Sequence, residues 1–180
     1  MAAATVDGTV CVFLEPIALY PTSDLHVPGD GEWADPYVPP GDWAATHVPI
    51  GVPRVYGEDA DVLIVTWANG LHMSLRVARR LSATLGIRCR IVDLRWLSPL
   101  PVDVIARHAA DVGRVLVVDE TRASGGVGEG IVAGLVAAGV TGPIKRVASR
   151  DTFIPLGDAA LTVMVSEADI EAALTALAQA

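Results

Sequence analysis

Val62-Leu63-Ile64-Val65-Thr66, continued by Trp67-Ala68-Asn69-Gly70, is the stretch of sequence that decides the fold. Aliphatic and β-branched residues follow one another without polar alternation, which is typical of a strand covered on both faces. Three more runs of this kind lie at residues 89–94, 115–119 and 144–148. Because helical patterns separate them, the sequence predicts right-handed crossovers and a mostly parallel sheet in a three-layer α/β sandwich.

The segments between the predicted strands have the apolar spacing of amphipathic helices. One helix is expected to begin near Pro101, which suits a first helical turn. The last is expected to begin at Ser166, where a hydroxyl followed three residues later by Asp169 predicts a capping box. Residues 54–57 are expected to add an edge strand. The apolar positions expected on the buried helix faces are Leu71, Leu75, Val77, Ala78, Leu81, Leu85, Ile105, Ala109, Val112, Ile131, Leu135, Val136, Ile170, Ala173, Leu174 and Leu177.

An irregular, Pro- and Gly-rich arm at residues 1–53 precedes the domain predicted at residues 54–180. Residues 10–14 (VCVFL) are interpreted as one buried strand. The rest of the arm has little periodicity, and a loop of this length usually packs on something else. Large aromatic side chains need a surface to bury against. We therefore expect an interface with another domain or subunit to include Trp33, Tyr37 and Trp43.

The composition indicates a globular protein and excludes some classes of partner. The chain has 180 residues, of which 52% are hydrophobic, and a formal net charge of -8. Negative charge is repelled by phosphate backbones and anionic lipid, so no nucleic-acid or membrane partner is expected. The first residues lack the basic region of a signal peptide. Cys11 and Cys89 have no metal or disulfide spacing and are expected to be buried free thiols of a cytoplasmic protein.

The loop after the first predicted strand of the domain is a candidate binding site, because ligands of such sheets bind at the carboxyl ends of strands. It contains Asn69, Gly70 and His72. Amide groups at the start of the helix could meet an anion or a carbonyl oxygen. The alternative is structural: Asn69 caps the helix and His72 lies in its first turn.

A second candidate loop follows residues 115–119 and contains Asp119, Glu120, Arg122, Gly125 and Gly126. Its glycines do not match the G-x-G-x-x-G pattern of a dinucleotide site. The alternative is that a helix approaches closely here and needs small residues, while the polar residues cluster at the strand end. The sequence has no histidine pair with metal-binding spacing and no G-x-S-x-G elbow of a hydrolase.

Five segments in order resemble the beta subunits of thiamine-diphosphate-dependent 2-oxo acid dehydrogenases. Residues 12–20 (VFLEPIALY) resemble the end of their pyrimidine-binding domain. Four segments resemble the transketolase C-terminal domain that follows: residues 64–73 (IVTWANGLHM), 92–100 (VDLRWLSPL), 117–129 and 146–155. The resemblance covers nearly all of the chain. The family more commonly has Tyr-Gly where this chain has Trp-Ala before its only asparagine.

The resemblance implies a role in the oxidative decarboxylation of a 2-oxo acid onto lipoyl groups by a complete enzyme with thiamine diphosphate and magnesium. Residues 24–31 (DLHVPGDG) resemble fused alpha–beta versions that act on branched-chain 2-oxo acids. In the family this domain forms the dimer interface and helps to dock the acyltransferase core. The implied partners are therefore that core, a thiamine-diphosphate-binding alpha-type chain or missing N-terminal domains, and a second copy of the chain.

Because only the last strand of the pyrimidine-binding domain is expected here, no catalytic, cofactor-binding or metal-binding residue is carried over. Gly29-Asp30-Gly31 resembles the family's magnesium motif, but no strand precedes it, and we interpret it as a loop turn. The isolated chain is expected to bind no cofactor. Two other hypotheses remain: a Rossmann-like module that binds a small anion or nucleotide, and a small flavodoxin-like enzyme. The lack of a nucleophile–base pair disfavours the enzyme.

Overall fold

A computed structural model describes residues 2–180 and contains one sheet of five strands in the order β1-β3-β2-β4-β5. Strands β2, β3, β4 and β5 are parallel, and β1 pairs antiparallel with β3 at one edge. Both the mostly parallel sheet and the short edge strand are as predicted. The strands are β1 (Arg54–Tyr56), β2 (Val62–Thr66), β3 (Cys89–Asp93), β4 (Val115–Arg122) and β5 (Ile144–Ser149).

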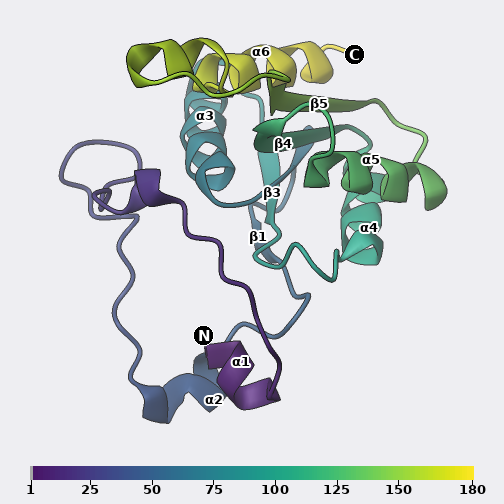
Figure 1. The fold of residues 1–180 in the computed structure, drawn as a ribbon. Helices are drawn as coiled ribbons and strands as arrows, with labels where there is room; N and C mark the ends of the chain where they lie inside the picture. Colours follow the sequence, from purple (N-terminus) through teal and green to yellow (C-terminus); the bar gives the residue numbers. More distant parts are fainter. Residues whose placement is uncertain (1) are drawn as a thin grey trace.

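Helices cover both faces of the sheet, which confirms the three-layer α/β sandwich. Helices α3 and α6 lie on one face, and α4 and α5 lie on the other (Figure 1). The helices of the sandwich are α3 (Asn69–Leu85), α4 (Val102–Val112), α5 (Val127–Ala137) and α6 (Glu167–Ala178). Short 3-10 turns occur at Ile17–Leu19, Pro40–Asp42 and Gly157–Thr162.

Two apolar cores result, because successive strand residues point to opposite faces of the sheet. In β2, Ile64 packs under α3 and α6, while its neighbours Leu63 and Val65 pack under α4 and α5. All five residues of β2 are buried, as expected for a central strand covered on both sides. The helix positions differ from expectation at two places: Leu85 and Val136 are exposed.

The last helix begins where the sequence predicts. Ser166 Oγ accepts a hydrogen bond from the Asp169 amide at 3.2 Å, and Asp169 Oδ2 accepts one from the Ser166 amide at 3.0 Å. This reciprocal pair is a capping box, and it provides acceptors for two backbone amides that have none within the helix. Two arginines of α3 clamp α6 from the side: Arg76 Nε donates to Glu167 at 2.7 Å, and Arg80 Nη2 donates to Glu171 at 2.7 Å.

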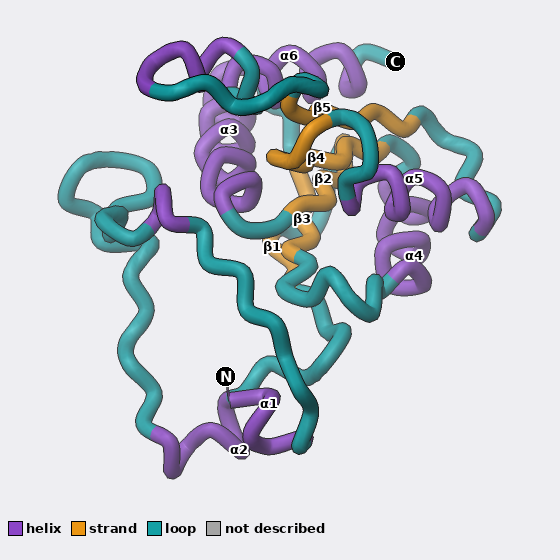
Figure 2. The backbone as a smooth tube through the Cα atoms, in the orientation of Figure 1, coloured by secondary structure: helices purple, strands orange, loops and turns teal. Residues whose placement is uncertain are grey.

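The arm leaves the sandwich and forms a wide loop of chain (Figure 2). Its two short helices, α1 (Ala2–Asp7) and α2 (Trp43–Thr46), lie side by side away from the sheet. The strand expected at residues 10–14 does not form in the described chain, where this segment has no regular secondary structure and pairs with no strand. Val10 is 96% and Phe13 70% exposed, because no neighbouring strand or core is available to cover them.

The two cysteines are free, as expected, but neither is fully buried. Cys89 begins β3, where burial raises the pKa of its thiol to about 12. Cys11 lies in the arm, outside any strand. No helix between residues 2 and 180 has the length and apolar character that a membrane crossing requires.

Candidate functional site at the carboxyl edge of the sheet

The two loops singled out in the sequence meet at the carboxyl edge of β2 and β4. Asn69 Nδ2, at the start of α3, donates a hydrogen bond to Glu120 Oε1 at 2.6 Å. The capping role expected for Asn69 is therefore wrong, because its side chain reaches across to the next strand. Ala68 is the N-cap residue instead and makes no side-chain cap bond. Burial raises the pKa of Glu120, the Asn69 hydrogen bond opposes this, and the neighbouring Asp119 charge raises the pKa further.

Close packing, rather than ligand binding, explains why glycine occupies position 70. A Cβ atom at this position would collide with Thr66 Oγ1 and lie 3.4 Å from Val118 Cγ1. Thr66 Oγ1 is itself held, because it donates to the Val118 carbonyl at 3.1 Å. The start of α3 thus sits directly on β2 and β4, and only glycine allows that approach.

The glycine turn after β4 is filled by the chain's own carboxylate. Asp119 is fully buried, and its Oδ2 accepts a hydrogen bond from the Gly128 amide at 2.8 Å. Its Oδ1 accepts from the Thr121 amide at 2.9 Å and from Thr121 Oγ1 at 2.7 Å. A Cβ atom at Gly126 would lie 2.6 Å from Asp119 Oδ2, and one at Gly128 would lie 2.8 Å from it. This geometry confirms the interpretation that small residues permit a close helix approach.

Polar groups from the end of β5 and from the turn after it lie on the other side of the same edge. Ser149 Oγ donates to the Glu120 carbonyl at 2.7 Å and accepts from the Val165 amide at 3.2 Å. Asp151 accepts from both the amide and the hydroxyl of Ser124 at 2.7 Å, and these bonds lower its pKa. Ser149 and Asp151 were not predicted as part of this edge, although their position at the end of a predicted strand was an available signal.

The remaining candidate residues are at the border of this cluster or outside it. Arg122, the last residue of β4, is paired with Ser149 but exposed, and Gly125 is exposed in the turn, where its amide donates to Glu129 Oε2 at 2.9 Å. His72 faces the arm: its ring meets Trp33 edge to face at 4.9 Å between centroids, and its Nε2 lies 3.3 Å from the Asp24 carbonyl. Trp33 thus covers the chain's own domain. Tyr37 is 81% exposed, and Trp43 Nε1 donates to the Val38 carbonyl at 3.1 Å.

The Gly-Asp-Gly triplet is a loop turn, as interpreted from the sequence. The Asp30 carboxylate accepts hydrogen bonds from the amides of Leu25, His26, Val27 and Glu32 at 2.7–3.0 Å. These amides hold the pKa of Asp30 far below its usual range. Because the carboxylate is turned into its own loop, the triplet does not fit the magnesium-binding role of the thiamine diphosphate motif. Across residues 2–180, no group of three or more His, Cys, Asp or Glu side chains is arranged for a metal ion.

These observations define a doubly covered parallel-sheet domain whose carboxyl edge is closed by its own side chains. The family model described as "Transketolase, C-terminal domain" matches residues 52–169. The chain belongs to the transketolase C-terminal domain family.

The chain is similar to parts of longer curated proteins. The chain is 29% identical over 173 residues to the pyruvate dehydrogenase E1 component subunit beta of Bacillus subtilis, covering 94% of this chain and 49% of that protein. It is 28% identical over 149 residues to the mitochondrial 2-oxoisovalerate dehydrogenase subunit beta of Dictyostelium discoideum, covering 81% and 36%. It is 32% identical over 131 residues to the 1-deoxy-D-xylulose-5-phosphate synthase of Albidiferax ferrireducens, covering 71% and 20%. The chain therefore spans half or less of these relatives.

Solved structures share the fold. A split-gene transketolase, described as an inactive beta4 tetramer, matches with a TM-score of 0.65 and 27% identity, covering 76% of this chain and 44% of that one. A 2-oxoglutarate:ferredoxin oxidoreductase from Magnetococcus marinus matches with a TM-score of 0.52 and 18% identity, covering 78% and 21%. The second likeness concerns the fold alone.

Proposed function

We propose that this chain is the assembly part of the decarboxylating component of a 2-oxo acid dehydrogenase and is not catalytic by itself. The observation that carries this proposal is that many large apolar side chains are exposed in the arm and in the segment before α6. Large exposed apolar patches mark interaction sites. The exposed side chains include Val10, Val12, Phe13, Leu14, Ile17 and Tyr20 in the arm, and Phe153, Ile154, Leu156 and Leu161 before α6.

The arm at residues 1–53 is proposed to belong to a pyrimidine-binding domain, with the α/β domain at residues 54–180 following it. An apolar extended segment without a neighbour needs a strand to pair with, since isolated strands are unstable in water. Residues 10–14 would become a strand only when the rest of that domain is present. The proposed partners are a thiamine-diphosphate-binding alpha-type chain or N-terminal domains, the acyltransferase core and a second copy of this chain.

In this proposal thiamine diphosphate and magnesium belong to the parent enzyme. A branched-chain 2-oxo acid is the proposed substrate class, supported by the resemblance of residues 24–31 and by the 2-oxoisovalerate dehydrogenase relative. The pyruvate dehydrogenase relatives favour pyruvate as the substrate instead. A cytoplasmic location fits two free cysteines, because reducing compartments keep thiols unpaired.

The alternative, a module for a small anion or nucleotide at the strand-end loops, has less support. The Gly128 amide, which would cradle an anion at the start of α5, is already bonded to Asp119. Asn69 is likewise engaged with Glu120. A ligand would have to break these bonds and leave buried polar groups without partners, at a cost of about 1–3 kcal/mol each.

The proposal is tested by affinity capture from native extract, with the bound proteins identified by mass spectrometry. We expect capture of a chain with a true thiamine diphosphate motif or of an acyltransferase core. Phe13→Ser and Leu156→Ser should weaken the capture, whereas Leu85→Ser, an exposed leucine at the end of α3, should not. Recovery of the chain without either protein, or equal loss in all three variants, contradicts the proposal.

A further inference from the structure

A pocket of the molecule lies away from the carboxyl edge of the sheet. It has a volume of about 290 Å³ and lies between the arm, β1, α3 and β3. Cys89 begins β3 and Arg88 precedes it, so the pocket lies toward the amino end of that strand. Four separate segments form its walls, and no residue of the carboxyl-edge cluster lines it.

The wall that the arm contributes is fixed by hydrogen bonds. Asp30 holds four amides of the loop, and Asp24 accepts from the amides of Gly29 and Gly31 at 2.7 and 2.9 Å. The loop is tied to α3, because Arg76 Nη1 donates to the Leu25 carbonyl at 2.9 Å. His26 is therefore held beside the pocket before any ligand arrives, which lowers the entropy cost of binding.

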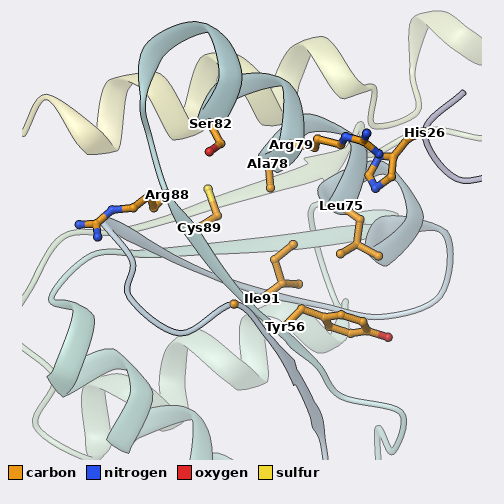
Figure 3. Close-up of a pocket in the computed structure, with 10 residues that line it drawn as sticks. His26, Tyr56, Leu75, Ala78, Arg79, Ser82, Arg88, Cys89 and Ile91 are labelled. Atoms are coloured by element: carbon orange, nitrogen blue, oxygen red, sulfur yellow. The ribbon is translucent and has the colours of Figure 1, made fainter. Parts of the chain in front are cut away.

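The floor of the pocket is apolar. Leu75, Ala78, Ile91 and Cys89 gather in its middle (Figure 3). Because burial raises the pKa of the Cys89 thiol to about 12, this group is a neutral part of the floor and not a nucleophile. The arrangement suits the binding of an apolar group rather than covalent chemistry.

Three basic residues and no carboxylate line the pocket, although the chain has a net charge of -8. Arg88 is engaged with Asp61, its Nη2 lying 3.2 Å from Oδ1, and it points outward at one end (Figure 3). Arg79 and His26 lie together at the other end.

Arg79 and His26 share one loosely placed carboxylate. Glu32 Oε1 lies 3.9 Å from Arg79 Nη1, and its Oε2 lies 3.7 Å from His26 Nε2. Both distances exceed those of a hydrogen bond. Burial, and then the neighbouring Arg79 charge, lower the pKa of His26, so its ring is neutral and offers one N–H donor, while Arg79 supplies the positive charge. Because Glu32 satisfies neither group, a carboxylate entering from the pocket side could bond there.

We propose that this pocket binds a small organic carboxylate with a short apolar body. Arg79 and His26 would receive the carboxylate, and Leu75, Ala78 and Ile91 would cover the apolar part. The cavity is at the lower limit of the usual volumes of ligand pockets, which fits a molecule of about ten non-hydrogen atoms. The inference does not depend on the proposed assembly role.

The test is an NMR titration of the whole chain with 4-methylpentanoate, and with 4-methylpentan-1-ol as the uncharged comparator. We expect saturable amide shifts at Gly57, Ala78 and Ser82 with the acid, and much weaker ones with the alcohol. Ala78→Leu should abolish binding by filling the floor, provided that its spectrum shows a folded chain. The absence of saturable shifts, or equal binding of acid and alcohol, overturns the proposal.

Charge variants separate this pocket from unspecific attraction of an anion. Arg79→Gln should weaken binding about fivefold, the size expected for a partly exposed charge pair. Glu32→Gln should strengthen binding, because it removes the competing carboxylate. Arg107→Gln is the matched control, since Arg107 is exposed on α4 on the opposite face of the sheet. An equal loss in Arg107→Gln and Arg79→Gln would refute a specific site.

Discussion

Gly128→Ala tests whether the glycine turn after β4 is a packed contact or an open cradle. Alanine normally stabilises a helix relative to glycine by about 1 kcal/mol, and Gly128 lies in the first turn of α5. An added Cβ atom, however, would lie 2.8 Å from Asp119 Oδ2 and 2.9 Å from Arg146 Cδ. The helix preference and the packing cost therefore change the free energy of unfolding in opposite directions. The sign of the measured change decides between the packed contact and the open cradle.

We expect the packing cost to exceed the helix preference, so that Gly128→Ala destabilises the chain. Overpacking of a tight contact costs about 1–3 kcal/mol. Any retreat of Asp119 also strains its hydrogen bond with the Gly128 amide, and a bond to a charged group is worth about 1.5–3 kcal/mol. Subtracting the helix preference leaves a destabilisation of about 2 kcal/mol, or about 4–8 °C in Tm for a domain of this size.

Gly130→Ala in the same helix is the control. Gly130 is exposed, and a Cβ atom there would meet only Leu100 Cδ1 at an ordinary 3.6 Å. This variant should gain up to about 1 kcal/mol from helix preference alone. Unfolding by urea, followed by circular dichroism, measures both variants against the unchanged chain. If Gly128→Ala is as stable as Gly130→Ala, the close approach to Asp119 is refuted.

Three further predictions concern the loops. Ala68 has φ of 51° and ψ of -129°, which side chains disfavour, so Ala68→Gly should raise stability by about 1 kcal/mol in urea unfolding; lower stability would refute the strain. Because the pKa of Glu120 is raised in the folded chain, the stability that protonated Glu120 contributes is fully present below its unfolded pKa. This stability is lost as the pH rises through its folded pKa. Glu120→Gln keeps an acceptor for Asn69, so its stability relative to the unchanged chain should increase as pH rises over this range; a pH-independent difference would contradict this. Asp30→Ala should speed hydrogen exchange of the Leu25 and His26 amides, and unchanged exchange would show that these bonds do not hold the loop.

The sequence predicted the sandwich well because its signals are local and agree with one another. The run at residues 62–66 coincides with β2, and the capping box at Ser166 and Asp169 formed as expected. The segment at residues 10–14 has the same apolar character but formed no strand. A strand needs a neighbour, and the character of a short run cannot reveal whether a neighbour exists.

The sequence indicated that the two candidate loops lie at the carboxyl edge of the sheet, but it did not reveal which of their side chains bond to one another. Asn69 and Glu120 were expected at the same edge because parallel strands end together, yet their hydrogen bond spans residues far apart in sequence. Asp119 was recognised as a strand-end residue, but its burial within the glycine turn depends on how closely α5 approaches β4. The pocket beside Arg79 gave no sequence signal, because its four walls come from separate segments.

The proposal that this chain assembles an enzyme rather than holding its cofactor is tested most directly by calorimetric titration of thiamine diphosphate with magnesium. The titration is made first into the isolated chain and then into its complex with the captured partner. We predict no heat of binding for the chain alone and saturable binding for the complex. Micromolar binding by the isolated chain would contradict the proposal.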